Sequence, residues 1–99
     1  MLFRSARHII FKGRVQGVGY RNFVFEAATA QRLQGWVRNR MAGTVEAVLI
    51  GPAETVAAVI EQCRKGPPAS RVEGIDHSDA TPQQRALYEG SGFEVLPTV

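Results

Sequence analysis

The chain has 99 residues, of which 44% are hydrophobic and 21% are charged. This composition is typical of a folded globular domain and excludes a largely disordered chain. The length predicts a single domain over residues 1–99. No apolar stretch approaches the length of a membrane span, so we expect a cytoplasmic protein with no membrane partner.

Cysteine, histidine and net charge narrow the classes of ligand. The only cysteine is Cys63, which excludes a disulfide within the chain. The two histidines, His8 and His77, show no ligand spacing, so we expect no metal and no cofactor. The net charge of +3 and the isoelectric point near 9.6 favour an anionic partner. Charge alone does not separate a small anion from a nucleic acid.

The first half of the chain predicts a strand, a helix and a hairpin. Residues 7–12 are β-branched and aromatic in the middle, which is typical of a buried strand. In residues 20–33 the apolar side chains recur every three or four positions, which predicts a helix with Gly35 as its C-terminal cap. Residues 36–40 and 44–50 predict two strands joined by a short turn that ends in glycine.

The second half predicts a helix, a strand and a short terminal strand. The Gly51-Pro52 pair starts a helix, and a run of glycine and prolines at residues 66–68 ends it. Residues 71–77 predict a strand, residues 78–91 a loop, and residues 93–96 a last short strand. The helix has an apolar stripe that we expect to face the core, formed by Val56, Val59, Ile60 and Cys63.

The order of these elements is β-α-β-β-α-β with an addition at the C-terminus. This order predicts the ferredoxin-like split βαβ arrangement, an α+β fold. Its antiparallel sheet carries two helices on one face, and the extra C-terminal strand would extend it. Because many unrelated activities share this fold, the prediction says little about function.

Between the first strand and the first helix, residues 13–21 read GRVQGVGYR. Three glycines in seven residues allow a turn whose backbone N–H groups point into one concavity. Arg21 falls in the first turn of the helix, so these groups together favour a phosphate site. The glycine spacing matches neither of the common nucleotide-binding loops, and the run by itself is also compatible with a plain strand-to-helix connection.

A second run strengthens the phosphate interpretation. Residues 35–51 read GWVRNRMAGTVEAVLIG. The two runs resemble the two signatures of the acylphosphatase family, in order and at the family's separation. The first resembles its glycine-rich phosphate loop ending in aromatic-Arg, here Tyr20-Arg21, and the second its G-aromatic-V-basic-N pattern, here residues 35–39. Residues 67–76 also resemble the family's link into its fourth strand.

The resemblance implies a function and a site. Family members of this kind hydrolyse the carboxyl–phosphate bond of acyl phosphates, with acetyl phosphate, carbamoyl phosphate and 1,3-bisphosphoglycerate as candidate substrates and inorganic phosphate as a product. By resemblance, Arg21 binds the phosphate and Asn39 orients the attacking water, with no metal. The same resemblance assigns phosphate binding to the backbone of the loop residues Val15, Gln16, Gly17, Val18, Gly19 and Tyr20.

Other chemistry-bearing residues have plainer interpretations. We expect Glu26, Glu46 and Glu54 to be solvated positions, because none pairs with another acid at a useful spacing. Cys63 is expected to be a core residue, and Trp36 and Tyr20 packing residues. Arg38 and Arg40 are expected to add a positive field at the mouth of the site.

We expect a monomer with no nucleic-acid partner, but two other function classes stay open at this point. A ferredoxin-like module could bind RNA without catalysis, although the strand at residues 8–12 offers only Phe11 for stacking. A regulatory domain could bind a small phosphate without turning it over. The presence of both Arg21 and Asn39 argues against that second alternative.

Overall fold

The computed structural model describes residues 4–88, 90 and 92–99. Its elements follow the chain as β1 (Arg4–Arg14), α1 (Tyr20–Ala30), β2 (Gln34–Asn39), β3 (Val45–Pro52), α2 (Ala53–Lys65), β4 (Arg71–Asp79), α3 (Pro82–Arg85) and β5 (Phe93–Val95). The predicted βαββαβ order is confirmed, and so is the extra strand at the C-terminus.

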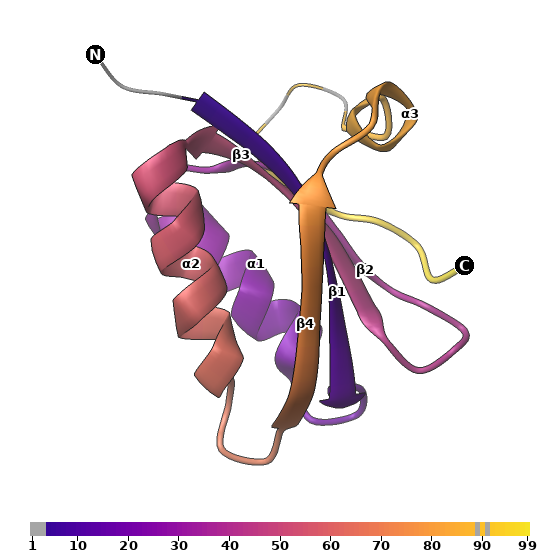
Figure 1. Ribbon diagram of the computed structural model, residues 1–99. Helices are drawn as coiled ribbons and strands as arrows, with labels where there is room; N and C mark the ends of the chain where they lie inside the picture. Colours follow the sequence, from indigo (N-terminus) through magenta and orange to yellow (C-terminus); the bar gives the residue numbers. More distant parts are fainter. Residues whose placement is uncertain (1–3, 89, 91) are drawn as a thin grey trace.

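The strands form one sheet in the order β4-β1-β3-β2-β5. The first four strands of the chain pair in antiparallel fashion, whereas β5 pairs with β2 in parallel. Figure 1 shows α1 and α2 together on one face of this sheet, as the ferredoxin-like arrangement requires. Among the described residues, no helix has the length and apolar character needed to cross a membrane.

The alternation of side chains in β3 divides the protein into two layers. Val45, Ala47 and Leu49 belong to the core beneath the helices. Val48 and Ile50 point to the other face, where they pack with Trp36. On the helix side, the predicted stripe of α2 is confirmed, because Val56, Val59, Ile60 and Cys63 are all buried there.

The C-terminal part of the chain covers a portion of the helix-free face. Trp36 is fully buried, and its indole N–H donates a hydrogen bond to the carbonyl of Gln84 at 2.9 Å. Residues 78–91 were expected to form a loop, but they contain the end of β4 and the short helix α3. The Thr81 hydroxyl and the Gln84 side chain cap α3 reciprocally. Residues 89 and 91 of the expected loop lie outside the described residues.

The predicted end of the first helix is wrong. α1 ends at Ala30, and Arg32 takes the left-handed backbone conformation with φ of 58°. The Leu33 N–H donates to the Ala28 carbonyl at 3.0 Å, which closes the helix end without glycine. Leu33 is buried in the core, so tertiary packing explains this early stop. Gly35, the expected cap, lies inside β2 instead.

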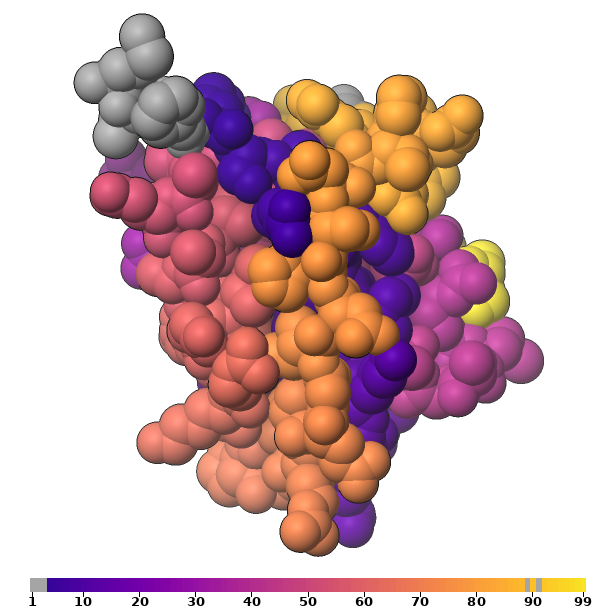
Figure 2. All heavy atoms as spheres, in the orientation of Figure 1, coloured from indigo at the N-terminus to yellow at the C-terminus, as the bar shows by residue number. Residues whose placement is uncertain are grey.

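Figure 2 views the molecule over β4, with α2 along one side of the strand and α3 above it. On the other side of β4, the figure shows parts of β1 and then the β2–β3 hairpin. This hairpin and the connection from β1 to α1 carry the residues that the sequence singles out. The fold therefore decides whether those two segments meet.

Candidate active site

The connection between β1 and α1 is a short loop with two glycines in the left-handed conformation. Gly17 has φ of 73° and Gly19 has φ of 80°, and a Cβ atom would meet no neighbour at either position. The backbone conformation rather than crowding therefore favours glycine here. Gly19 is the N-cap of α1, and no side chain caps this helix end. The first backbone N–H groups of α1 are thus left for another acceptor.

Arg21 is the second residue of α1 and is half-buried. Its side chain makes no hydrogen bond or ion pair with any described residue. There is also no acidic residue in the first turn of α1. The guanidinium is therefore available, beside open backbone N–H groups, to hold an anion with paired donors.

Asn39 is the last residue of β2 and pairs with Val45 of β3. It is half-buried, and its side-chain oxygen Oδ1 is buried without a hydrogen-bond partner. A buried polar atom without a partner costs free energy unless water or a ligand satisfies it. Asn39 therefore has the donor and acceptor needed to hold a water molecule.

The fold brings the loop, Arg21 and Asn39 to a single surface depression of about 210 Å³. Of the residues predicted for the site, only Val18 is absent from the lining; its side chain packs partly against the core. Asn22, which the sequence analysis did not single out, lines the depression next to Arg21. The described residues that line the depression are Val15, Gln16, Gly17, Gly19, Tyr20, Arg21, Asn22 and Asn39, none of which is acidic.

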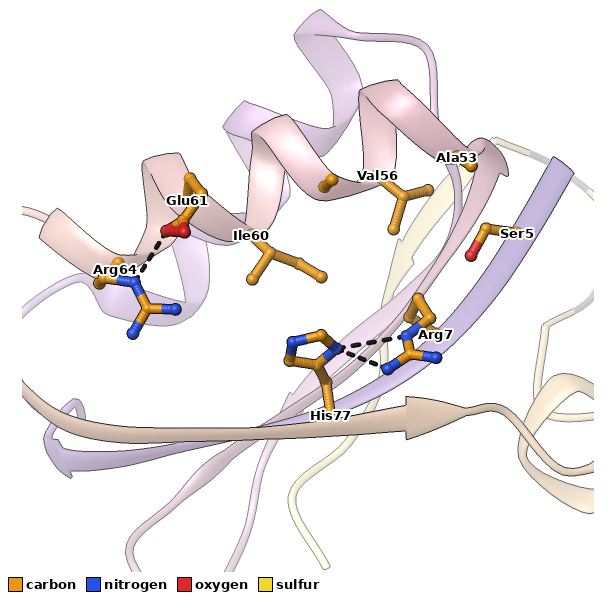
Figure 3. Close-up of a pocket in the computed structure, with 9 residues that line it drawn as sticks. Ser5, Arg7, Ala53, Val56, Ile60, Glu61, Arg64 and His77 are labelled. Atoms are coloured by element: carbon orange, nitrogen blue, oxygen red, sulfur yellow. Dashed lines mark hydrogen bonds and ion pairs between the residues drawn. The ribbon is translucent and has the colours of Figure 1, made fainter. Parts of the chain in front are cut away.

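A second hollow of about 260 Å³ lies between α2 and the strands β1 and β4. Figure 3 shows Arg7 and His77 on its sheet side, joined by hydrogen bonds to the His77 ring nitrogen Nδ1. Arg7 also pairs with Asp79 at 2.8 Å, and Arg64 pairs with Glu61 at 2.8 Å. Because these cations already have partners and no predicted site residue lines this hollow, the depression beside the loop is the better candidate.

Comparison with known proteins places these features in a family. A family model described as acylphosphatase matches residues 7–95. The chain belongs to the acylphosphatase family. A curated acylphosphatase of Rhizorhabdus wittichii is 51% identical over 97% of this chain and 92% of its own length. One of Azorhizobium caulinodans is 49% identical over 93% of this chain and 95% of its own length.

A solved structure agrees with the sequence comparisons. The crystal structure of an acylphosphatase from Bacillus subtilis matches with a TM-score of 0.82 and 35% sequence identity, over 95% of this chain and 99% of that one. The family and the near-complete coverage show that the chain is a hydrolase that acts on acyl phosphates. The predicted family resemblance is thereby confirmed.

Two side chains near the site of the acylphosphatase are structural, as predicted. Tyr20 is fully buried and its hydroxyl donates to the carbonyl of Cys63 at 2.5 Å. Burial, together with the nearby Cys63, raises the pKa of Tyr20 far above its ordinary value. Burial also raises the pKa of the Cys63 thiol to about 12, so this thiol stays protonated and inert near neutral pH.

The interpretation of Glu46 as a solvated position is wrong. Glu46 is buried on the helix-free face, where its carboxylate accepts from His8 at 2.6 Å, Arg38 at 2.8 Å and Arg40 at 3.4 Å. Burial by itself would raise the pKa of Glu46. The hydrogen bonds from His8 and Arg38 and their charges outweigh it, so the pKa is lowered.

The contacts of Glu46 also show that the expected role of Arg38 is wrong. Its guanidinium lies 4.9 Å from the centre of the Trp36 ring and binds Glu46, on the face of the sheet opposite to the core residue Val37. Arg40 also reaches Glu46. The charges of both arginines are therefore directed to a buried carboxylate, and not to the depression at Asn39. Among the described residues, no three His, Cys, Asp or Glu side chains gather where they could hold a metal.

Proposed function

We propose that Arg21 and the loop amides hold the phosphate of an acyl phosphate, while Asn39 positions the attacking water. One observation carries this proposal. Arg21 and the buried oxygen of Asn39, two predicted groups with free donor or acceptor capacity, line the same depression as the uncapped start of α1. A phosphate dianion there would satisfy the backbone N–H groups and the guanidinium together.

The chemistry follows from these positions. Water held by Asn39 attacks the phosphorus while the bond from phosphorus to the acyl oxygen breaks. The bonding electrons leave with the carboxylate, and one proton of the water passes to a phosphate oxygen. Because the carboxylate is a good leaving group, positioning and charge stabilisation suffice for this step.

None of the described residues that line the depression is acidic, which fits this division of roles. A carboxylate base beside a phosphate dianion would repel it, whereas the neutral amide of Asn39 does not. Arg21 neutralises charge that spreads over the phosphoryl oxygens in the transition state. This scheme does not use a metal ion at any step.

The RNA-binding alternative is disfavoured by burial. Phe11 lies in the core beneath the helices, and Trp36 is covered on the opposite face. Both are fully buried, so neither presents a ring on which a base could stack. We propose in addition that the protein acts as a monomer in the cytoplasm. The reduced, buried Cys63 suits that compartment.

Two alanine variants test the assigned roles. Asn39→Ala should lower kcat for benzoyl phosphate on the order of a hundredfold, because it removes an interaction made with the nucleophile. The inhibition constant of inorganic phosphate should change less than about twofold. Arg21→Ala should weaken phosphate inhibition as well as turnover.

The alternative for Asn39 is a simple turn residue, and it predicts a different result. In that case Asn39→Ala would lower the melting temperature and leave kcat of the folded fraction near that of the parent. A stable Asn39→Ala protein with parental kcat would remove Asn39 from the mechanism. Absence of benzoyl phosphate hydrolysis by the parent would favour a domain that binds phosphate without turnover.

A further inference from the structure

The side chain of Gln16 connects the glycine-rich loop to the β2–β3 hairpin. Its amide nitrogen Nε2 lies 2.8 Å from the carbonyl oxygen of Arg40 and 2.8 Å from that of Thr44. Both partners are acceptors, so the NH₂ end of the amide must face them. Each carbonyl thus receives one of its two N–H donors.

These two carbonyls bracket the turn that follows Asn39. The turn is closed by its own hydrogen bonds, from the Arg40 N–H to the Thr44 carbonyl and from the Gly43 N–H to the Arg40 carbonyl, both at 2.9 Å. Gln16 therefore adds no bond that the turn needs for its shape. In the described part of the chain, it supplies the only hydrogen bonds between residues 15–20 and residues 39–45.

The position of Asn39 depends on its backbone. Its side-chain oxygen has no partner, so no hydrogen bond to that atom fixes where the amide lies. Ladder pairing joins Asn39 through Val45 to Phe11 of β1, the strand that leads into the loop, but the pairing of β1 with β3 ends at Phe11 and does not reach the loop itself. Beyond the sheet, the described hydrogen bonds that connect the loop directly to the hairpin are those of Gln16 to the carbonyls on either side of the turn.

We propose that Gln16 is a positioning residue, whose side-chain amide holds Asn39 in register with the phosphate loop. This inference rests on the proposed roles of Arg21 and Asn39. Hydrolysis requires the water, the phosphorus and the leaving oxygen to lie nearly in line. A displacement of about 1 Å in such an arrangement can cost on the order of a hundredfold in rate.

A double-mutant cycle with Gln16→Met and Asn39→Ala tests the proposal. Methionine keeps the length of the side chain and removes both donors. Gln16→Met should lower kcat for benzoyl phosphate about tenfold in the parent, but less than about twofold in the Asn39→Ala background. The inhibition constant of inorganic phosphate should change less than about threefold, because Arg21 and the loop amides stay in place. Gln62→Met, an exposed change on α2, is the matched control and should leave kcat unchanged.

The outcomes separate this inference from the proposed function. An equal loss from Gln16→Met in both backgrounds would overturn it, since Gln16 would then act independently of Asn39. Parental kcat in Gln16→Met would overturn it as well. If Asn39→Ala itself keeps full activity, the assigned role of Asn39 fails first.

Two provisions keep the test decisive. If Asn39→Ala turns over too slowly for the cycle, loss of kcat with retained phosphate inhibition supports the proposal, and parallel loss of both contradicts it. If Gln16→Met does not fold, Gln16→Asn replaces it, because the shorter amide cannot reach both carbonyls. Thermal melting of each variant shows whether the protein assayed is folded.

Discussion

Replacing Arg21 by lysine keeps the charge at the start of α1 and removes the planar pair of donors. The Arg21 side chain makes no hydrogen bond or ion pair with any described residue, so the substitution breaks no polar side-chain contact of the folded protein. Arginine and lysine also have nearly equal helix propensities. We expect the free energy of unfolding to change by less than ~0.5 kcal/mol. For a domain of this size, that corresponds to a shift of about 2 °C in Tm.

The effect on catalysis should be much larger. An ammonium group donates to the phosphoryl oxygens from a single point, and it cannot match two of them with parallel hydrogen bonds. Losing that match in the transition state should lower kcat/KM on the order of a hundredfold, which is about 2.7 kcal/mol. The expected result is thus a fully folded protein with a severe defect in activity.

The assay is hydrolysis of benzoyl phosphate, with thermal melting measured on the same samples. Arg85→Lys is the matched control, because Arg85 is an exposed arginine at the end of α3. It should change neither kcat/KM nor Tm. If Arg21→Lys hydrolyses benzoyl phosphate within about twofold of the parent, a difference of less than ~0.5 kcal/mol, the bidentate role of Arg21 is refuted.

The remaining predictions concern the buried Glu46 with its cationic partners, two glycines, and the absence of a metal from the scheme. Glu46→Gln should destabilise the fold by about 2 kcal/mol, because it leaves the partly buried Arg38 and His8 without their carboxylate; thermal melting measures this. Because the pKa of Glu46 is lowered in the folded state, ionised Glu46 adds its full share to the free energy of unfolding at pH values well above the ordinary glutamate pKa of about 4.3. This stabilisation is lost as the pH falls below that value. Unfolding curves at a series of pH values should show a smaller acid dependence for Glu46→Gln than for the parent. Gly35→Ala should lower Tm far more than Gly43→Ala: both glycines have positive φ, but a Cβ at Gly35 would lie 1.9 Å from a backbone oxygen, whereas the space at Gly43 is open. Excess chelator should leave the hydrolysis rate unchanged; a loss that a divalent ion restores would contradict the mechanism.

Local patterns in the sequence predicted most of the helices and strands, and they singled out the two segments that line the depression. The spacing of apolar residues in α2 predicted its buried stripe, because helical periodicity is a property of neighbouring positions. The glycines of the loop predicted its turn for the same reason. Thr81 and Gln84 have the spacing of a capping box, so the sequence also contains a signal for α3. The polar composition of residues 78–91 nevertheless predicts a loop there.

The features that were missed depend on partners far away in the chain. Glu46 is buried because β1 and β2 place His8 and Arg38 on either side of it, and no spacing around Glu46 signals that pairing. The link made by Gln16 ends on backbone carbonyls, which every residue carries, so no residue type in the hairpin indicates it.

The sequence by itself determined the order of strands and helices and the glycine-rich turn between β1 and α1, and it supplied the proposal that Arg21 and Asn39 serve phosphate and water. These follow from local conformational preference and chemical type. Only the tertiary structure decided that Arg21 and Asn39 line the same depression and that β5 joins the sheet in parallel. It also decided that α1 stops early to bury Leu33. Each of these outcomes depends on packing and pairing between segments that are distant in sequence, where the burial of apolar surface outweighs local preference.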